Sequence, residues 1–523
     1  MNGPGGEGRR PRMVEDLCRP QAWPHPADQV RLVETHISWV FLAGDFAYKL
    51  KKPLDLGFLD FRDRDRRLFF CNEEVRLNRR LAPELYLEVT GAAEGAEGWR
   101  MGPLTPKAEP AVKMRRFPDA AQLDRQLKAG QLDAADLEGF AAELADFHAE
   151  APKAPSDGDL GSPQAVIGPA LENFRQLSKA TLDRELRDQV ASLEDWTRTQ
   201  ARLLTESFAA RLADGWVREC HGDLHLANLV RLQGRIAAFD GIEFDPALRW
   251  IDVISDAAFL LMDTESRGRA DLGWAFLNAW LERLGGHEGC ALLPWYLAYR
   301  HLVRAKVDGI RLTQDAGDEA DGLRQRIARH VSLAVKRAHH PPPLLVLMSG
   351  YSGSGKTHVA RQLAPALGAI RLRSDVERKR LHGVDPSEDR AAPPGEGLYS
   401  KAATERTYAR LESVAGAVLG AGVPVILDAA FLAADRRRHF VGMAGGYGAV
   451  PVILRCQAAP AVLRDRVAGR EGDASDAGLA VLADQMRRYP PPGDDEVYRV
   501  ETVRTDAAPD IQALARRLTD REA

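Results

Sequence analysis

Short runs of alternating apolar and polar residues, followed by long runs with helical spacing, occupy the first two thirds of the chain. This pattern predicts a small antiparallel sheet with one helix on it, and then a mainly helical lobe. The tight turn between the first two strands falls at Gly44-Asp45, and residues 263–336 are largely helical as well. The predicted strands are 37–42, 46–50, 111–117 and 235–239, and the predicted helices are 62–81, 132–149 and 182–212.

The last third alternates short apolar strands with helices, a pattern typical of a parallel sheet. The predicted strands are 344–349, 370–373, 423–427, 450–456 and 501–506, and the clearest helices are 358–367 and 404–419. Between the two parts stands His339-His340-Pro341-Pro342-Pro343, whose prolines cannot continue a helix.

We therefore predict two domains, each able to fold by itself. The first spans residues 14–338, with a small lobe over 14–118 and a large lobe over 119–338, and the second spans 344–523 after a proline linker at 339–343. Residues 1–13 are rich in Gly, Pro and Arg, so we expect this start to be disordered.

The strongest motif lies between the strand at 344–349 and the helix that follows it. The stretch from Gly350 to Thr357 fits G-x-x-x-x-G-K-[ST] at every fixed position. Such a loop turns its backbone N–H groups toward phosphate oxygens, its lysine reaches the β and γ phosphates, and its hydroxyl ligates Mg²⁺. The motif predicts that ATP is bound by Gly350, Ser352, Gly353, Ser354, Gly355, Lys356 and Thr357.

Other polar residues at the strand ends of this half predict its remaining chemistry. Asp375 follows the second strand and is placed to act as a base, while Arg378 suits an anionic part of the acceptor. Asp428 ends an apolar strand, as does the carboxylate that holds Mg²⁺ or its water in related sites. The polar segment 381–400 is expected to form a loop over the acceptor.

Three arginines further on, at 464, 466 and 470, suit a lid that neutralises charge during transfer. Of these we assign catalytic roles to Arg464 and Arg470. The alternative is that all three are simply solvated on one helix.

A second set of motifs lies in the first half. His221 to Asn228 fits H-x-D-x-x-x-x-N, and Asp240 follows the next strand. In kinases such an Asp accepts the proton of the attacking hydroxyl, which gives Asp223 the role of base and makes Asn228 and Asp240 the Mg²⁺ ligands.

The phosphates in this half need a cation as well. Lys49 in the second strand is the candidate, and it needs a glutamate from the helix at 62–81. Glu74 is assigned to it, although the spacing does not decide between Glu73 and Glu74, and Lys51 and Lys52 are expected to lie in solvent.

The composition excludes several classes of protein. The 523 residues carry a net charge of −4 and no basic stripe with aromatic residues, which argues against long nucleic acid as a partner. The five cysteines have no metal-binding spacing, and no apolar run is long enough to span a membrane. We expect a cytoplasmic protein.

The first half resembles the aminoglycoside phosphotransferase and choline kinase superfamily through its HGDLHLAN segment, Lys49 and Asp240. The resemblance covers residues 14–338 and implies an α+β protein kinase-like, two-lobed domain. No G-x-G-x-x-G loop precedes Lys49, and Asp240-Gly241 lacks the intervening Phe of protein kinases.

The second half resembles the small P-loop kinases, such as gluconate kinase, chloramphenicol phosphotransferase, the kinase domain of polynucleotide kinase and the zeta toxins. Its S-D-x-x-R segment at 374–378 supports this group, which implies an α/β P-loop NTPase domain with a parallel sheet. The order of both halves is similar to that of a bacterial family of bifunctional aminoglycoside phosphotransferase and ATP-binding proteins.

These observations lead to one main hypothesis and two alternatives. The chain is expected to be an ATP- and Mg²⁺-dependent phosphotransferase, in which each domain transfers a γ-phosphoryl group to a hydroxyl of a small molecule. In the first alternative one domain senses nucleotide and gates the other. In the second, the P-loop half phosphorylates a nucleotide-linked compound or a nucleic acid end. The sequence identifies neither the acceptors nor the oligomeric state.

Overall fold

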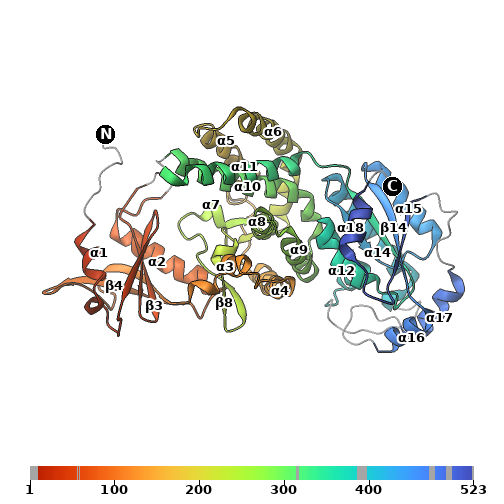
Figure 1. Ribbon diagram of the computed structural model, residues 1–523, viewed down its shortest axis with the longest axis horizontal. Helices are drawn as coiled ribbons and strands as arrows, with labels where there is room; N and C mark the ends of the chain where they lie inside the picture. Colours follow the sequence, from red (N-terminus) through yellow and green to blue (C-terminus); the bar gives the residue numbers. More distant parts are fainter. Residues whose placement is uncertain are drawn as a thin grey trace. The chain divides into compact units, whose positions relative to one another are not determined.

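The computed structural model describes residues 10–55, 57, 59–313, 317–385, 397–469, 478–489 and 498–520 (Figure 1). The chain divides into two compact units. The first comprises Met1–Leu132, Glu150–Gly161 and Gly215–Asp256, and the second comprises Asp133–Ala149, Ser162–Asp214 and Ala257–Ala523. This division cuts through the predicted large lobe, and the domain boundaries at 14–338 and 344–523 stay a prediction.

The start of the chain is ordered slightly earlier than expected. Helix α1 (Arg12–Leu17) begins just before the predicted boundary at residue 14. Val14 and Leu17 of this helix are fully buried in an apolar cluster against the first sheet, which explains why the helix is held there. Residues 1–9 of the segment expected to be disordered lie outside the part of the chain that the structure describes.

The first unit is built on a six-stranded antiparallel sheet in the order β1-β2-β3-β6-β4-β5. Because side chains alternate between the faces of a strand, β3 directs Leu50 into one apolar cluster and Ala47 into another. The second cluster includes Val75 of α2, so α2 covers the face that Lys49 and Lys51 share with Ala47. These elements are β1 (Val30–Glu34), β2 (Ser38–Ala43), β3 (Phe46–Lys51), α2 (Arg64–Asn78), β4 (Tyr86–Gly95), β5 (Gly98–Gly102) and β6 (Glu109–Arg115).

Two small antiparallel ladders flank the H-x-D-x-x-x-x-N motif of the first unit. Strand β7 (Val217–Glu219) pairs with β10 (Trp250–Asp252), and β8 (Leu229–Leu232) pairs with β9 (Arg235–Ala238). Residues 221–228 therefore connect β7 to β8, and Asp240 follows the end of β9. The remaining short elements are η1 (Pro20–Ala22), η2 (Asp119–Ala121), α3 (Leu123–Lys128), η3 (Leu226–Asn228) and α7 (Pro246–Arg249).

Long helices follow, and those predicted over 132–149 and 182–212 are confirmed as α4 and α6. Leu193 of α6, Leu302 of α10 and Ile327 of α11 share one apolar core with Phe174 of α5. The helical elements are α4 (Ala134–Glu150), α5 (Pro163–Leu177), α6 (Arg184–Ala213), α8 (Val253–Ser266), α9 (Ala270–Leu284), η4 (His287–Leu292), α10 (Leu293–Thr313), η5 (Gly317–Glu319) and α11 (Ala320–Ala338).

The last third forms a parallel five-stranded sheet in the order β12-β13-β11-β14-β15. Its central strand is buried from Leu345 to Ser349, as the continuous apolar run predicts. Helices α12 and α18 pack on it through Val359 and Leu514, and α14 and α15 contact β13 and β14. The strands are β11 (Leu344–Ser349), β12 (Ile370–Arg373), β13 (Val425–Asp428), β14 (Val450–Gln457) and β15 (Val500–Arg504). The helices are α12 (Lys356–Leu367), α13 (Ser374–Leu381), η6 (Gly397–Tyr399), α14 (Lys401–Gly420), α15 (Ala434–Gly446), α16 (Pro460–Ala468), α17 (Leu479–Arg488) and α18 (Ile511–Thr519).

Helix α9 of the preceding half borders strand β12, and both belong to the second unit. The side-chain amide of Asn278 donates to the carbonyl of Ala369 at 2.9 Å and accepts from the backbone N–H of Arg371 at 2.7 Å. One turn earlier, Trp274 lies so close to Gly368 that a Cβ there would be 3.2 Å from its indole nitrogen. One side chain thus satisfies two of the backbone groups that a further strand would bind.

The chain therefore combines a protein kinase-like domain with a P-loop domain that has a parallel sheet, as its motifs predict. Among the helices that the structure describes, none is long and apolar enough to cross a bilayer.

Candidate active sites

Lys49 lies between two carboxylates in the first unit. Its ammonium is 2.9 Å from Oε1 of Glu74 and 2.6 Å from Oδ1 of Asp240. Strand β3 supplies the lysine, the buried face of α2 supplies the glutamate, and the turn after β9 supplies the aspartate. Kinases use such a lysine on the α and β phosphates and such an aspartate on Mg²⁺.

The same contacts decide which glutamate pairs with Lys49. Glu74 is completely buried, whereas Glu73 accepts from Arg76 at 2.8 Å and lies 3.7 Å from Arg249. The two glutamates are neighbours in α2, so they point about 100° apart around the helix, and only one can face β3.

Lys51 does not lie in solvent, so the expectation from the sequence is wrong for this residue. Its side chain is fully buried, its ammonium is 2.7 Å from Oε2 of Glu74, and it forms a second ion pair with Glu243. Alternation along β3 was the signal that could have shown this, since Lys49 and Lys51 are two residues apart and share a face. Lys51, Lys52 and Pro53 follow one another at the end of the strand, and this polar run indicated exposure instead.

The ion pairs shift the pKa values in this cluster. Burial would raise the pKa of Glu74, but Lys49 and Lys51 outweigh it and lower the pKa to about 2. Burial raises the pKa of Glu243, and the ion pair with Lys51 does not outweigh this effect. Burial would lower the pKa of Lys49, yet Asp240 and Glu74 raise it well above its usual value. Lys49 is therefore a permanent cation in the site.

Asp223 and Asn228 meet in the segment between β7 and β8. The amide nitrogen of Asn228 donates to Oδ2 of Asp223 at 3.0 Å and to its backbone carbonyl at 3.0 Å. Since the nitrogen is the donor, the amide oxygen of Asn228 is the atom that could ligate a metal. Nε2 of His225 lies 3.3 Å from Oδ2 of Asp223. A partly exposed carboxylate fixed in this way suits a general base.

His221 links this segment to the turn that carries Asp240. Its Nε2 lies 3.0 Å from the carbonyl of Phe239, so this nitrogen carries the proton, and its Nδ1 accepts from the N–H of Asp223 at 3.3 Å. Burial lowers the pKa of His221, which keeps the ring neutral. A neutral ring with one donor and one acceptor fixes the spacing between Asp223 and the turn that carries Asp240.

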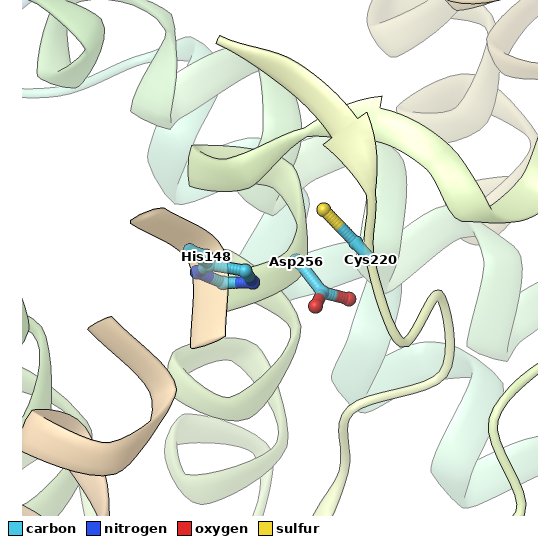
Figure 2. A group of neighbouring side chains, drawn as sticks. All are labelled: His148, Cys220 and Asp256. Carbon is cyan, nitrogen blue, oxygen red and sulfur yellow. The ribbon is translucent and has the colours of Figure 1, made fainter. Parts of the chain in front are cut away.

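Gly222 and Asp256 shape the backbone just before Asp223. Gly222 has φ 86°, and a Cβ on it would lie 2.7 Å from the carbonyl of Leu248, so only glycine fits. Asp256 accepts from the N–H groups of His221 at 3.1 Å and Gly222 at 2.9 Å. Figure 2 shows its carboxylate beside the thiol of Cys220, whose pKa is raised well above its usual value by burial.

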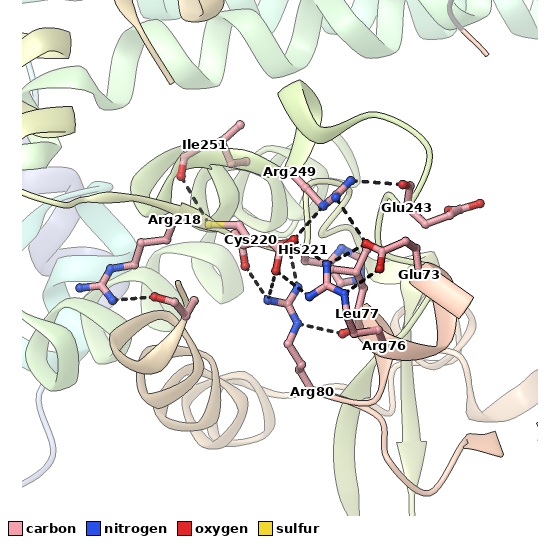
Figure 3. Close-up of polar contacts among 12 residues, drawn as sticks. Glu73, Arg76, Leu77, Arg80, Arg218, Cys220, His221, Glu243, Arg249 and Ile251 are labelled. Atoms are coloured by element: carbon pink, nitrogen blue, oxygen red, sulfur yellow. Dashed lines mark hydrogen bonds and ion pairs between the residues drawn. The ribbon is translucent and has the colours of Figure 1, made fainter. Parts of the chain in front are cut away.

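An arginine cluster ties α2 to the start of the same segment. Figure 3 shows Arg76, Arg80 and Arg249 gathered there, and all three bond to Glu219 at the end of β7. Arg76 reaches the Glu219 carboxylate at 2.8 Å, Arg249 reaches it at 3.1 Å, and Arg80 donates to its backbone carbonyl at 2.9 Å. The helix that carries Glu74 is thereby fixed relative to the segment that carries Asp223. Sequence reasoning missed this cluster because its members are far apart in the chain.

The loop from Gly350 to Thr357 lies in the second unit and leads into α12. Gly353 has φ 80°, and a Cβ on it would be 2.7 Å from the carbonyl of Leu463, so the loop approaches α16 more closely than any side chain would allow. The ammonium of Lys356 donates to the carbonyls of Gly350 at 2.8 Å and Tyr351 at 2.9 Å. The N–H of Ser352 donates to Gln485 of α17 at 2.8 Å. The lysine and the start of α12 make this loop a site for anions.

Thr357 and Asp428 form the best candidate for a metal site in this half. The hydroxyl of Thr357 donates to Oδ1 of Asp428 at 3.2 Å, and within the described ranges Oδ2 of Asp428 is buried without a hydrogen-bond partner. Burial raises the pKa of this carboxyl group. A hydroxyl and a buried carboxylate oxygen are ligands that Mg²⁺ accepts, so the residues fit the ion.

Asp375 and Arg378 lie on one face of α13, where the nitrogen of Arg378 is 2.8 Å from Oδ1 of Asp375. Both line a cavity of about 920 Å³ together with Lys356, Thr357 and Asp428. The predicted base, anion-binding arginine, phosphate-binding lysine and metal ligands of this half therefore share one cavity. Of the predicted acceptor loop 381–400, residues 386–396 lie outside the described part of the chain.

The arginines of α16 are placed differently from the expectation. Arg466 lines the cavity and donates to the backbone carbonyl of Thr505 at 2.6 Å, whereas Arg464 lies exposed on the same helix and does not line it. Arg470 lies outside the described residues. The catalytic roles of Arg464 and Arg470 stay predictions.

Comparison with known proteins identifies relatives of the whole chain. It is 34% identical over 457 residues to the uncharacterized protein Rv2004c of Mycobacterium tuberculosis (strain ATCC 25618 / H37Rv), which covers 86% of this chain and 88% of that protein. The uncharacterized protein Mb2027c of Mycobacterium bovis matches over the same length at the same identity. Residues 345–492 match a family model described as an AAA domain.

Solved structures similar to each half are more distant. A choline/ethanolamine kinase family protein from Mesorhizobium loti is 14% identical, covers 62% of this chain and 99% of its own, and gives a TM-score of 0.37. A gluconokinase from Sinorhizobium meliloti 1021 is 23% identical, covers 34% of this chain and 89% of its own, and gives a TM-score of 0.24.

Proposed function

Because the chain belongs to one family with the mycobacterial protein Rv2004c, and the match is longer than either half, we propose one function for the chain with both halves as its working parts. The proposed function is ATP-dependent phosphotransfer at two sites. Each site transfers the γ-phosphoryl group of ATP, with Mg²⁺, to a hydroxyl of a small molecule. A location in the cytoplasm stays a prediction.

The observation that carries this proposal is the position of Lys49 between Glu74 and Asp240. A buried lysine with a helix glutamate on one side and a half-exposed aspartate on the other has one cation for nucleotide phosphates and one carboxylate for Mg²⁺. A module that only binds nucleotide would not also need Asp223, fixed by Asn228 at 3.0 Å in the neighbouring segment.

The residues of the first unit have distinct tasks in transfer. Asp223 accepts the proton of the acceptor hydroxyl as that oxygen forms its bond to the γ-phosphorus. The bond from the γ-phosphorus to the bridging oxygen breaks, and ADP leaves with the electron pair. Lys49 holds the α and β phosphates, and Asn228 and Asp240 would hold Mg²⁺, which neutralises charge on the phosphates.

The P-loop half has the same division of tasks. Lys356 and the loop N–H groups hold the β and γ phosphates, and Thr357 and Asp428 would hold Mg²⁺. Asp375 takes the acceptor proton, and Arg378, 2.8 Å from it, fixes its orientation and offers a charge to the acceptor. The cavity of about 920 Å³ is in the range usual for small-molecule sites, which favours a small acceptor over a nucleic acid.

A screen of ATP consumption tests the proposal. The full-length chain, Asp223→Asn and Lys356→Ala are each assayed with Mg²⁺ against sugars, amino alcohols, aminoglycosides and nucleosides. We expect at least one acceptor that Asp223→Asn no longer phosphorylates but Lys356→Ala still does. We also expect at least one other acceptor that Lys356→Ala no longer phosphorylates but Asp223→Asn still does. If one substitution abolishes every activity, the two sites are coupled, as in the sensor alternative. If neither substitution lowers any activity, the proposed sites are wrong.

A further inference from the structure

Glu282 of helix α9 reaches into the P-loop half. Its carboxylate forms ion pairs with Arg371 and Arg373 of the edge strand β12, the second with 2.6 Å between Oε1 and the Arg373 nitrogen. Burial would raise the pKa of Glu282, but Arg371 and Arg373 lower it, so the carboxylate stays charged. All three residues line the same cavity as Lys356 and Asp428.

Arg373 has a second carboxylate within reach. Its Nε lies 3.9 Å from Oδ2 of Asp428, the buried oxygen that has no hydrogen-bond partner among the residues described. At that distance the two charges attract, yet the guanidinium makes no hydrogen bond to this oxygen. The strands place them together, because Arg373 and Asp428 are direct partners in the register of β12 and β13.

This inference rests on the proposed function of the P-loop site. We propose that Glu282 is a positioning residue for that site, which holds Arg373 away from Asp428 and so leaves the Asp428 carboxylate for Mg²⁺. The helix of the preceding half is then a working part of the P-loop kinase.

The physical reason is competition for one buried oxygen. A buried guanidinium that loses its closest carboxylate is costly, and the nearest remedy for Arg373 is to close the 3.9 Å gap to Asp428. The resulting ion pair would occupy the oxygen that a divalent cation needs. Groups behind a metal ligand typically change metal affinity by about 10–100-fold when they are removed.

Binding of a fluorescent ADP analogue to the full-length chain tests the proposal without an acceptor. The part of the signal that Lys356→Ala removes is assigned to the P-loop site. For this part, Glu282→Gln should raise the Mg²⁺ concentration for half-maximal binding about tenfold, and it should change affinity in EDTA less than about twofold.

Two further variants separate positioning from a merely structural role. Arg373→Gln alone should leave the Mg²⁺ requirement unchanged or lower it. Glu282→Gln with Arg373→Gln should return the requirement toward the wild-type value, because the cation 3.9 Å from Oδ2 of Asp428 is gone. Glu138→Gln is the matched control, since Glu138 of α4 also pairs across to the P-loop half, with Arg361, and lines the same cavity. It should have no effect.

An unchanged Mg²⁺ requirement in Glu282→Gln would overturn the inference, and so would a double variant that stays as defective as the single one. If Glu282→Gln fails to fold, a raised Mg²⁺ requirement in Arg373→Gln overturns it independently. If Lys356→Ala removes no signal, the proposed P-loop function itself fails, which is a distinct result.

Discussion

Lys49 and Asp240 are 191 positions apart in the chain, and their charged groups lie 2.6 Å apart. Asp240 reaches this position with φ 60°, a left-handed conformation that costs a residue other than glycine about 1 kcal/mol or more. Its N–H donates to the hydroxyl of Tyr86 at 3.0 Å, and the N–H of Gly241 donates to Asn78 at 2.8 Å. The strained turn is therefore held in place by the sheet and by α2, and it aims the carboxylate at the lysine.

The buried pair around Lys51 predicts a large effect on stability. Lys51→Ala would leave Glu74 and Glu243 buried with one cation fewer, and breaking such a buried pair costs about 3–5 kcal/mol. Urea unfolding of the full-length chain measures the loss in the free energy of unfolding. Hydrogen exchange in α2 and β3 then shows whether the loss is local to this cluster. Lys52→Ala is the control: its partner Glu34 is largely exposed, and we expect a loss below about 1 kcal/mol. Equal losses in both variants would contradict the network.

Asp223 and Asp240 should separate chemistry from binding. Asp223→Asn keeps the shape of the side chain but cannot accept a proton, so transfer at this site should fall by about 10²–10⁴-fold with ATP affinity nearly intact. Asp240→Asn removes a charge beside Lys49 and the proposed metal ligand, so Mg·ATP binding should weaken. Calorimetry with and without Mg²⁺, in a Lys356→Ala background, measures the two affinities. If Asp223→Asn weakens Mg·ATP binding and Asp240→Asn does not, the assignment of base and metal ligand is reversed.

The arginines of α16 give a third prediction. Arg466 lines the cavity and donates to the backbone carbonyl of Thr505 at 2.6 Å. Because Arg466→Ala would release the segment that carries Thr505, it should lower nucleotide affinity at the P-loop site about tenfold. Arg464→Ala, measured in parallel, decides whether the exposed neighbour has a role of its own. A loss of transfer without a loss of binding in Arg464→Ala would support the catalytic role predicted from the sequence.

His287 predicts a pH dependence where the P-loop half meets the preceding helices. It is fully buried, and its Nδ1 lies 3.6 Å from Glu377 of α13, with Glu288, Arg380 and Arg410 nearby. Burial lowers its pKa to about 4 from 6.5. Between these values the unfolded chain binds a proton and the folded one does not, so stability falls as pH drops from 6.5 toward 4, by up to about 3 kcal/mol.

Local hydrogen exchange of η4 and α13 at pH 7 and pH 5 measures this loss. His287→Gln has no group that titrates in this range and should show a smaller difference between the two values. If the stability difference between pH 7 and pH 5 is the same in His287→Gln as in the wild type, other histidines cause the pH dependence. One such residue is His330, whose pKa is lowered to about 3 by burial.

The sequence predicted the elements and motifs because these depend on local patterns. The P-loop and the strand before it follow from motif spacing and from the apolar run. The roles of Glu73 and Glu74 needed the orientation of α2, and the burial of Lys51 needed Glu243, 192 positions away. The role of Glu282 could not be predicted, because nothing in the sequence of its helix indicates that it faces Arg371 and Arg373 of β12.

The amide of Asn278 has a consequence for any attempt to divide the chain. It binds two backbone groups on the open side of β12, the outermost strand of the parallel sheet. Cutting at the prolines would leave those groups exposed beside apolar residues, as a template for strands of other molecules. The sequence predicts that the P-loop half folds by itself, but a fragment of residues 341–523 should then tend to self-associate through this strand. In the intact chain Asn278 opposes such self-association, because its amide already binds the two backbone groups.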